Sequence, residues 1–325
     1  MKRRRFAKSL IVGLISPPLL VRANQPKKRE ARYEISISQW CFHHAIFGAS
    51  RQNYSKFLKM LRTSPDSVLL GEMDPRDITK VARRLDVSII DMVNVLWFGH
   101  AKDRPWLKEL KQRAEDDGVS FGLLMCDQLG SIGASNSELR TRAVENHLPW
   151  MEAAAEIGCS QLRVNAYGDG SYLDKLNQCA ESLHRLCELG AEFNLEILVE
   201  NHGHQSNNGA WLAMLIDQTN HSNSGVLLDL DNFFMGGWNI DPPRLYDRLQ
   251  GVIDLAPYTK GVSAKTYDFD NEGNESSIDY KLCLEILIDA GFKGRVSAEF
   301  EGTTLTEYEG SKRTLELLRA YQYET

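Results

Sequence analysis

Short β-prone apolar runs alternate with longer stretches of helical periodicity from residue 34 to the end of the chain. Eight such runs predict strands, at 35–40, 88–95, 120–127, 161–165, 196–202, 225–231, 261–266 and 295–301. Between the runs, apolar side chains recur every three or four positions at 142–157 and 174–190, and again just before Gly291. The pattern therefore predicts a succession of strand–helix units.

The spacing of the runs predicts how the units assemble. Their centres lie 30 to 40 residues apart, except for a first interval of 53. No hairpin signal separates them, which favours a parallel sheet. Eight units predict a closed (β/α)₈ TIM barrel, a single α/β domain. An open, doubly wound sheet is the alternative, but the glycine-rich nucleotide motif typical of that fold is missing.

The long first interval contains one further β-prone segment, at 67–72. We expect this segment to form a loop, because eight evenly spaced strands remain without it.

The first 23 residues have the composition of an export signal. They carry six basic and no acidic side chains around an apolar stretch at 9–21, which is too short for a membrane-spanning helix. Residues 3–8, RRRFAK, resemble the twin-arginine export motif; a general secretory signal or an uncleaved anchor is the alternative. We predict a cleaved signal peptide at 1–23, a linker at 24–33 and a barrel at 34–325. The protein is then periplasmic or otherwise extracytoplasmic, without a stable membrane anchor.

Charge and cysteine content narrow the class of partner. The whole chain has 38 basic and 44 acidic residues, and removal of 1–23 leaves 38 − 6 = 32 against 44, a net charge of −12. Such acidity argues against a nucleic-acid partner. The six cysteines form no C-x-x-C pair, and we expect most of them to be small buried hydrophobic residues. The sequence is compatible with a homo-oligomer.

Polar residues gather where the predicted strands end, which is where barrels of this kind carry their active sites. They are Trp40, Arg163, Asn165, Glu200, His202, Asp229, Lys265 and Glu299, with His43 just beyond the first strand. Carboxylates that converge from separate strands repel one another unless a cation or a shared proton compensates. A divalent metal is the economical explanation. Lys265, at an inward position, is expected to pair with one of the acids or to bind a substrate oxygen.

Four motifs in order carry a family resemblance: ENHG at 200–203, DLDNF at 229–233, VSAK at 262–265 and AEFEG at 298–302. They resemble the xylose-isomerase-like TIM barrels of the sugar phosphate isomerase/epimerase family, over residues 34 to 321. The resemblance implies a divalent metal, Mn²⁺, Mg²⁺, Co²⁺ or Zn²⁺, bound by Glu200, Asp229 and Glu299. The histidine that such barrels supply from strand seven is absent, because Ser263 and Lys265 stand there. His202 is the candidate for its place.

These parts together predict an enediolate mechanism. Glu200 or Glu299 removes the proton beside a sugar carbonyl, and the other acid or His202 returns it. Lys265 completes the catalytic set. Trp40, His43, Arg163 and Asn165 are expected to bind the substrate. Because phosphorylated sugars are mainly cytoplasmic, an exported protein favours an unphosphorylated carbohydrate.

Three alternatives to an isomerase or epimerase remain. The first is a lyase or hydratase that acts on 3-keto-glycosides. The second is a non-catalytic carbohydrate-binding relative, which the missing strand-seven histidine suggests. The third is a phosphodiesterase similar to AP endonucleases, but such enzymes need more metal-binding histidines and a basic groove for DNA.

Overall fold

The computed structural model of the protein describes residues 30–236 and 240–323. The predicted signal peptide and residues 24–29 of the predicted linker lie outside the described residues. At the end of that linker, Arg32 donates to the Tyr321 carbonyl and Tyr33 to the Leu318 carbonyl, at 2.6 and 2.7 Å. The segment just before the first strand is thus tied to the last helix.

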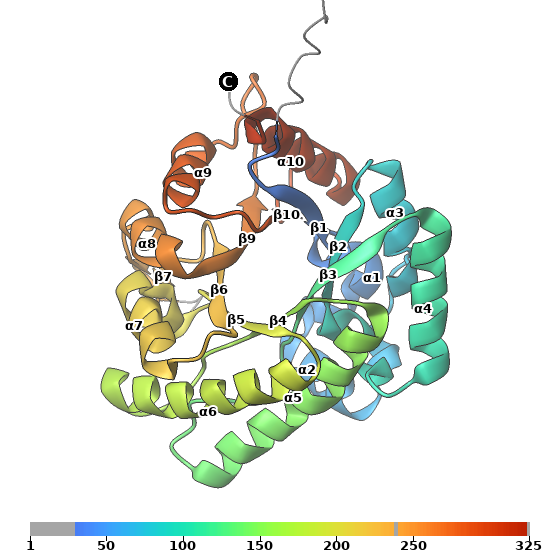
Figure 1. Ribbon diagram of the computed structural model, residues 1–325. Helices are drawn as coiled ribbons and strands as arrows, with labels where there is room; N and C mark the ends of the chain where they lie inside the picture. Colours follow the sequence, from blue (N-terminus) through green and yellow to red (C-terminus); the bar gives the residue numbers. More distant parts are fainter. Residues whose placement is uncertain (1–29, 237–239, 324–325) are drawn as a thin grey trace, which may run out of the picture. The chain divides into compact units, whose positions relative to one another are not determined.

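Eight parallel strands of the described residues close into a barrel, in the order β1-β10-β9-β6-β5-β4-β3-β2 (Figure 1). They are β1 (Glu34–Ser38), β2 (Ile89–Val93), β3 (Ser120–Met125), β4 (Gln161–Val164), β5 (Glu196–Glu200), β6 (Ser224–Asp229), β9 (Thr259–Thr266) and β10 (Arg295–Phe300). In β1, Ile37 pairs with Ala298 of β10 and with Ile90 of β2, so the first and last strands complete the ring. The predicted fold is confirmed.

Helices surround the barrel (Figure 1). They are α1 (His43–Phe47), α2 (Tyr54–Thr63), α3 (Ile78–Arg84), α4 (Arg104–Asp117), α5 (Ser137–Ile157), α6 (Tyr172–Glu192), α7 (Gly209–Thr219), α8 (Arg248–Leu255), α9 (Tyr280–Asp289) and α10 (Glu307–Tyr321). Local sequence sets their ends: Ser171 and Asp174 form a capping box at the start of α6, and Gly158 ends α5 with a φ of 93°.

Two segments between strands depart from the simple repeat. The long first interval contains α1, α2, α3 and short 3-10 turns, and residues 67–72 form no strand, as expected. After β6, the antiparallel pair β7 (Phe234–Met235) and β8 (Arg244–Leu245) forms a small excursion that the hydrophobic pattern did not predict. Two residues per strand are too few to produce a periodic signal.

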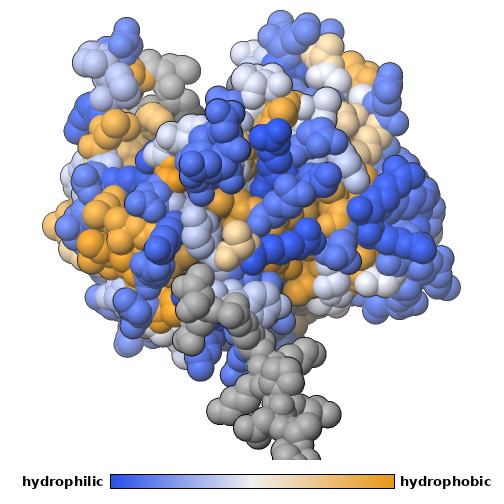
Figure 2. Space-filling model, turned by 90° about the horizontal axis from the view of Figure 1, so that it is seen from above, coloured by the Kyte–Doolittle hydropathy of each residue, from blue (hydrophilic) through white to orange (hydrophobic). Residues whose placement is uncertain are grey.

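The core and surface have the properties of an ordinary globular barrel. All six cysteines are buried and unpaired, which confirms the expectation that they serve as small hydrophobic residues. Figure 2 shows hydrophilic residues over much of the surface with smaller apolar patches between them. Every helix within 30–236 and 240–323 is too short or too polar to cross a lipid bilayer.

Candidate active site

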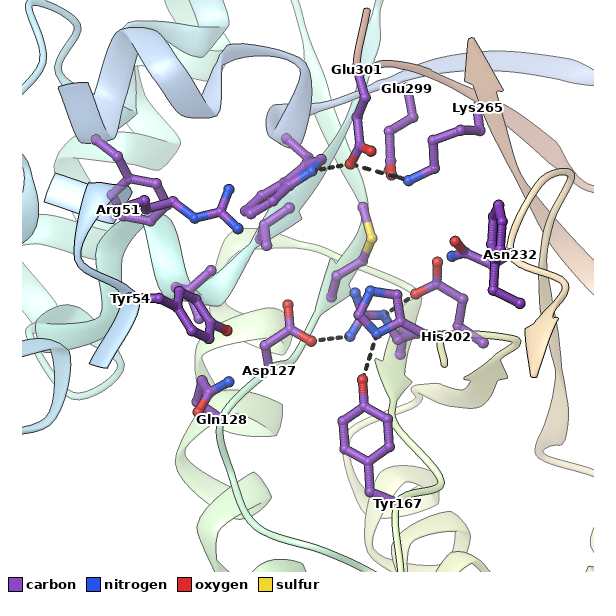
Figure 3. A pocket seen from close by; sticks show the side chains of 18 of the residues that line it. Arg51, Tyr54, Asp127, Gln128, Tyr167, His202, Asn232, Lys265, Glu299 and Glu301 are labelled. Atoms are coloured by element: carbon purple, nitrogen blue, oxygen red, sulfur yellow. Dashed lines mark hydrogen bonds and ion pairs between the residues drawn. The ribbon is translucent and has the colours of Figure 1, made fainter. Parts of the chain in front are cut away.

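A pocket of about 490 Å³ lies at the C-terminal ends of the strands (Figure 3). Part of its wall is aromatic or aliphatic: Trp40, Phe47, Tyr54, Phe57, Val93, Val95 and Met125. The rest is mainly polar and charged: Arg51, Asp127, Gln128, Arg163, Tyr167, Glu200, His202, Asn232, Phe234, Lys265, Tyr267, Glu299 and Glu301. Six of the predicted site residues therefore meet here, namely Trp40, Arg163, Glu200, His202, Lys265 and Glu299.

Lys265 stands at the centre of a cluster of carboxylates. It comes from β9, and its register partner on β10 is Glu299. The Lys265 Nζ donates to Glu299 Oε1 at 2.6 Å and lies 3.2 Å from Glu301 Oε1 and 3.3 Å from Asp229 Oδ2. Lys265, Asp229 and Glu299 are buried. The ammonium thus neutralises carboxylates at the ends of β6 and β10 that would otherwise repel one another.

Arg163 plays the corresponding part on the other side of the pocket. Its Nη1 donates to Asp127 Oδ1 at 2.7 Å and to the Cys126 carbonyl at 3.0 Å. Its Nε lies 2.7 Å from Glu200 Oε2, an ion pair whose angles fall short of a hydrogen bond. Arg163 therefore joins the ends of β3, β4 and β5 and supplies the positive charge beside Glu200.

Asp229 is held behind the pocket wall. Its Oδ1 accepts the backbone N–H groups of Asp231 and Asn232, at 2.8 and 2.9 Å, and so shapes the turn after β6. Its other oxygen faces Lys265. Asn201 fixes the same turn by exchanging hydrogen bonds with the Asp229 backbone, both at 2.8 Å. Asp229 is a predicted metal ligand, but it does not line the pocket and contacts the pocket residue Lys265.

Trp40 lies across the junction between the first and last strands. Its Nε1 donates to Glu301, and the Arg51 guanidinium lies over its ring, 4.9 Å from the centroid. His43 stacks parallel to the Trp40 ring at 4.4 Å. His43 is not among the residues that line the pocket, so it supports Trp40 and does not face the pocket as predicted. Burial lowers the pKa of His43 to about 4, and the imidazole is neutral at physiological pH.

Asn165 and His202 also have partners that the sequence did not predict. Asn165 does not line the main pocket; its Nδ2 donates to Asp127 Oδ1 at 2.6 Å and holds that carboxylate in place. His202 lines the pocket, and its Nδ1 lies 2.8 Å from the Tyr167 hydroxyl. Burial lowers the pKa of His202.

The carboxylates of the site differ in their acidity. Burial raises the pKa of Glu200 to about 7, although Arg163 acts in the opposite direction. Burial likewise raises the pKa of Asp229 to about 7 against the effect of Lys265. For Glu301, burial is outweighed by Lys265 and by the Trp40 hydrogen bond, and its pKa falls to about 2. Near neutral pH the site therefore holds both ionised carboxylates and groups able to exchange protons.

The metal expected from the sequence does not fit this arrangement. In the described parts of the chain, no three His, Cys, Asp or Glu side chains are grouped so that they could hold a metal ion. Two of the three predicted ligands, Asp229 and Glu299, face the Lys265 ammonium, and the third, Glu200, faces Arg163. His202, the candidate fourth ligand, faces Tyr167. Among the described residues, the cations in contact with these carboxylates are Lys265 and Arg163.

Sequence reasoning missed two acidic groups and a tyrosine. Asp127 comes two residues after the end of β3, and Glu301 directly follows β10. Both positions carry the strand-tip signal that identified Glu200 and Glu299. Tyr167, in the segment between β4 and α6, follows no such pattern.

Comparison with known proteins agrees with the barrel fold. Residues 80–321 match the xylose isomerase-like TIM barrel family. The search of curated proteins found no match.

Several solved structures share the fold. The 3-keto-D-glucoside 4-epimerase from E. coli is 16% identical, with a TM-score of 0.59, over 75% of this chain and 94% of that one. A xylose isomerase domain protein from Planctomyces limnophilus is 14% identical, with a TM-score of 0.60, over 90% and 97%. The D-psicose 3-epimerase from Clostridium cellulolyticum H10, solved with D-tagatose, is 12% identical, with a TM-score of 0.61, over 90% and 100%.

Identities this low establish a common fold and leave the reaction open. The match at 80–321 spans well over half of the chain and includes β2 to β10 with the residues at their tips. The protein therefore belongs to the xylose isomerase-like TIM barrel family.

Proposed function

We propose that the protein is a sugar isomerase or epimerase that acts through an enediolate on an unphosphorylated carbohydrate. The observation that carries the proposal is the pair Glu200 and Glu299, two buried carboxylates that line one pocket from β5 and β10. Two other strands, β9 and β6, separate them around the barrel, so they approach a bound sugar from different sides. That is the arrangement needed to remove a proton from one face of a carbon and return one to the other.

The proposed reaction breaks and re-forms one C–H bond. Glu200, as the carboxylate, takes the proton from the carbon next to a ketone, and the electron pair moves into an enediolate. The Lys265 ammonium and the Arg163 guanidinium stabilise the negative oxygen. The carboxyl group of Glu299 then donates a proton to the opposite face of the same carbon, or to the neighbouring carbon, and proton exchange with solvent returns both groups to their starting states. The first outcome is epimerisation and the second isomerisation.

The pocket lining supports a neutral sugar. Its charged side chains are four carboxylates, Asp127, Glu200, Glu299 and Glu301, and three cations, Arg51, Arg163 and Lys265. Arg163 and Lys265 already pair with carboxylates. A phosphate dianion would therefore meet an excess of negative charge. The Trp40 side of the wall offers an apolar surface on which a sugar ring can stack.

Export of the protein is part of the same proposal and rests on the sequence alone. A twin-arginine-like signal at residues 1–23 would carry the barrel to an extracytoplasmic compartment, where unphosphorylated sugars are the available substrates. Comparing the size of the protein in whole cells and in the periplasmic fraction tests this part.

A lyase or hydratase acting on 3-keto-glycosides is the second candidate. The observation that favours it is the Tyr167–His202 pair at the pocket wall, which can supply a proton to a departing oxygen. The same enediolate would then expel its β-substituent as an alcohol instead of regaining a proton at carbon. The two candidate reactions share their first step, the removal of the proton beside the ketone.

One experiment tests the shared step and separates the products. The purified protein is incubated with 3-keto-glucosides and with simple ketohexoses in deuterated water, and the products are followed by NMR. For the first candidate we expect deuterium at the carbon beside the ketone, on an intact epimer or isomer. For the second we expect a released alcohol and an unsaturated keto-sugar, which gains deuterium at that carbon only when water adds back across the double bond. Glu200→Gln and Glu299→Gln should each lower the rate by about 100-fold or more.

Glu196→Gln is the matched control, because Glu196 begins the strand that Glu200 ends and pairs with Lys260 at 2.8 Å, far from the pocket. It should leave the rate unchanged. Sugar binding without exchange or turnover, unchanged in Glu299→Gln, would instead identify a carbohydrate-binding relative.

A further inference from the structure

The position of Lys265 on β9 also determines how much space is left at the site for a metal ion. On β9, Ser263 pairs in register with Asp229 of β6, and Lys265 pairs with Glu299 of β10. Side chains two residues apart on a strand share a face, so Ser263 and Lys265 both point toward the barrel interior. Ser263 is too short to act as the missing histidine, and its buried Oγ has no hydrogen-bond partner among the described residues.

The Lys265 ammonium occupies the space that a shared metal ion would need. A divalent metal lies about 2.0–2.6 Å from its oxygen ligands. The Nζ is itself within 2.6 Å of Glu299 and 3.3 Å of Asp229, and a metal between these carboxylates would lie against it. Two positive centres at such a distance repel strongly inside a protein, where screening is weak.

The carboxylates already have a cation in contact with each of them. Lys265 forms ion pairs with Asp229, Glu299 and Glu301, and Arg163 forms ion pairs with Glu200 and Asp127. Both cations are almost completely buried, with 5% and 4% of their side chains exposed. A buried lysine is tolerated only with such partners, so the cluster is a built arrangement in which each charge needs the others.

We infer that the Lys265 ammonium replaces the divalent metal at this rim, so that the folded protein carries its electrophilic cation as a side chain. The ammonium holds Asp229 and Glu299 together and presents its N–H groups to a substrate oxygen. No bond to Lys265 forms or breaks. The inference concerns the site of the proposed function but is independent of which sugar is bound.

The test measures metal in the absence of substrate. Metal content of the purified, full-length protein is determined by mass spectrometry, and Mn²⁺, Co²⁺ and Zn²⁺ are titrated by calorimetry. We expect substoichiometric metal and no tight binding in the wild type. In Lys265→Met, which keeps the length of the side chain and removes the charge, Mn²⁺ should bind at least about tenfold more tightly. The same ion should then raise the melting temperature of that variant.

Lys260→Met is the matched control. Lys260 lies on the same strand and pairs with Glu196 at 2.8 Å, at the other end of the barrel. It should gain no metal affinity, and neither should Lys265→Arg, which retains the charge. If Lys265→Met does not fold, the wild-type measurements still decide. Stoichiometric metal in the wild type, or Mn²⁺ binding that Lys265→Met fails to strengthen, would overturn the inference and leave the sugar assay unaffected.

Discussion

Glu200 meets two opposing demands, burial beside a pocket and an ion pair with Arg163. Burial dominates, which leaves its pKa, like that of Asp229, raised to about 7. The raised pKa means that the base is protonated in mildly acidic solution and becomes ionised as the pH rises through neutrality. Because the two groups interact, the observed value will belong to the pair.

We therefore expect kcat/KM for the sugar reaction to rise with pH and level off above an apparent pKa near 7. A rate profile from about pH 5 to about pH 9 measures it, and Asp229→Asn should move the midpoint. A profile that is flat between about pH 5.5 and 8 would contradict this assignment of the base.

The same shifts have a consequence for stability. An acid whose pKa is raised on folding stabilises the protein below its unfolded value, near 4, and loses that contribution as the pH rises to about 7. We expect Glu200→Gln to be less sensitive to pH than the wild type over this window. Urea denaturation at about pH 5 and about pH 7.5 provides the comparison. An equal loss of stability in both proteins would show that other groups control it.

Trp40 makes its contribution through an aromatic face and one N–H group. Trp40→Ala removes the stacking surface and the hydrogen bond to Glu301, and should raise KM about tenfold or more with a smaller effect on kcat. Trp40→Phe should recover part of the loss. Trp211→Phe is the control, since Trp211 donates to the Tyr172 carbonyl away from the pocket. A fall in kcat at constant KM would place Trp40 in the chemical step instead.

At the scale of residues, the sequence predicted the positions of the acidic side chains better than the groups that contact them. Glu200, Glu299 and Lys265 lie where strand alternation placed them, because the period of two is fixed by the pleat. The roles of His43 and His202 depend on loop conformations, which no periodicity determines. The metal prediction rested on the converging carboxylates and on the family resemblance, and it did not take into account that both Lys265 and Arg163 contact those carboxylates.

At the scale of elements, the predicted strands run past the observed ends on the side that carries the site. The predicted 196–202 is observed as Glu196–Glu200, and 225–231 as Ser224–Asp229. The apolar and polar alternation continues into residues that have already left the sheet. Side-chain hydrogen bonds, such as those of Asn201, replace the ladder there.

Asn201 is fully buried and makes three hydrogen bonds to the backbone at the ends of β6 and the following turn. Asn201→Ala leaves backbone groups without partners, and we expect it to lower the free energy of unfolding by about 1–3 kcal/mol. Urea denaturation measures the change. Asn177→Ala, at an exposed position of α6, should change it by less than about 0.5 kcal/mol. Similar effects of the two substitutions would show that Asn201 is not a structural link.

At the scale of the whole molecule, the composition and the period of strand–helix units were sufficient to predict a closed barrel. Closure itself is a long-range property, and it appeared in the sequence only as the number of units. The burial of all six cysteines has a similar origin, since each lies within or beside a strand or a helix that packs into the hydrophobic core.

These thiols should be inert in the folded protein, because burial raises the pKa of each of them. We expect almost no reaction with a thiol reagent under native conditions and six reactive thiols per chain after denaturation. A fraction of a thiol that reacts rapidly in the native state would indicate that part of the barrel opens.

The pairing of β1 with β10 also imposes an order on biosynthesis. Trp40 and its partner Glu301 are separated by 261 residues, and the strands they follow are the first and the last to be made. A ribosome must therefore release almost the entire chain before the two halves of the pocket can meet. Any shortened product that ends before residue 295 lacks β10 and, with it, the groups that hold Lys265 and Trp40. We therefore expect incomplete chains of this protein to be inactive toward sugars, so that the measured activity reflects the amount of complete, folded protein.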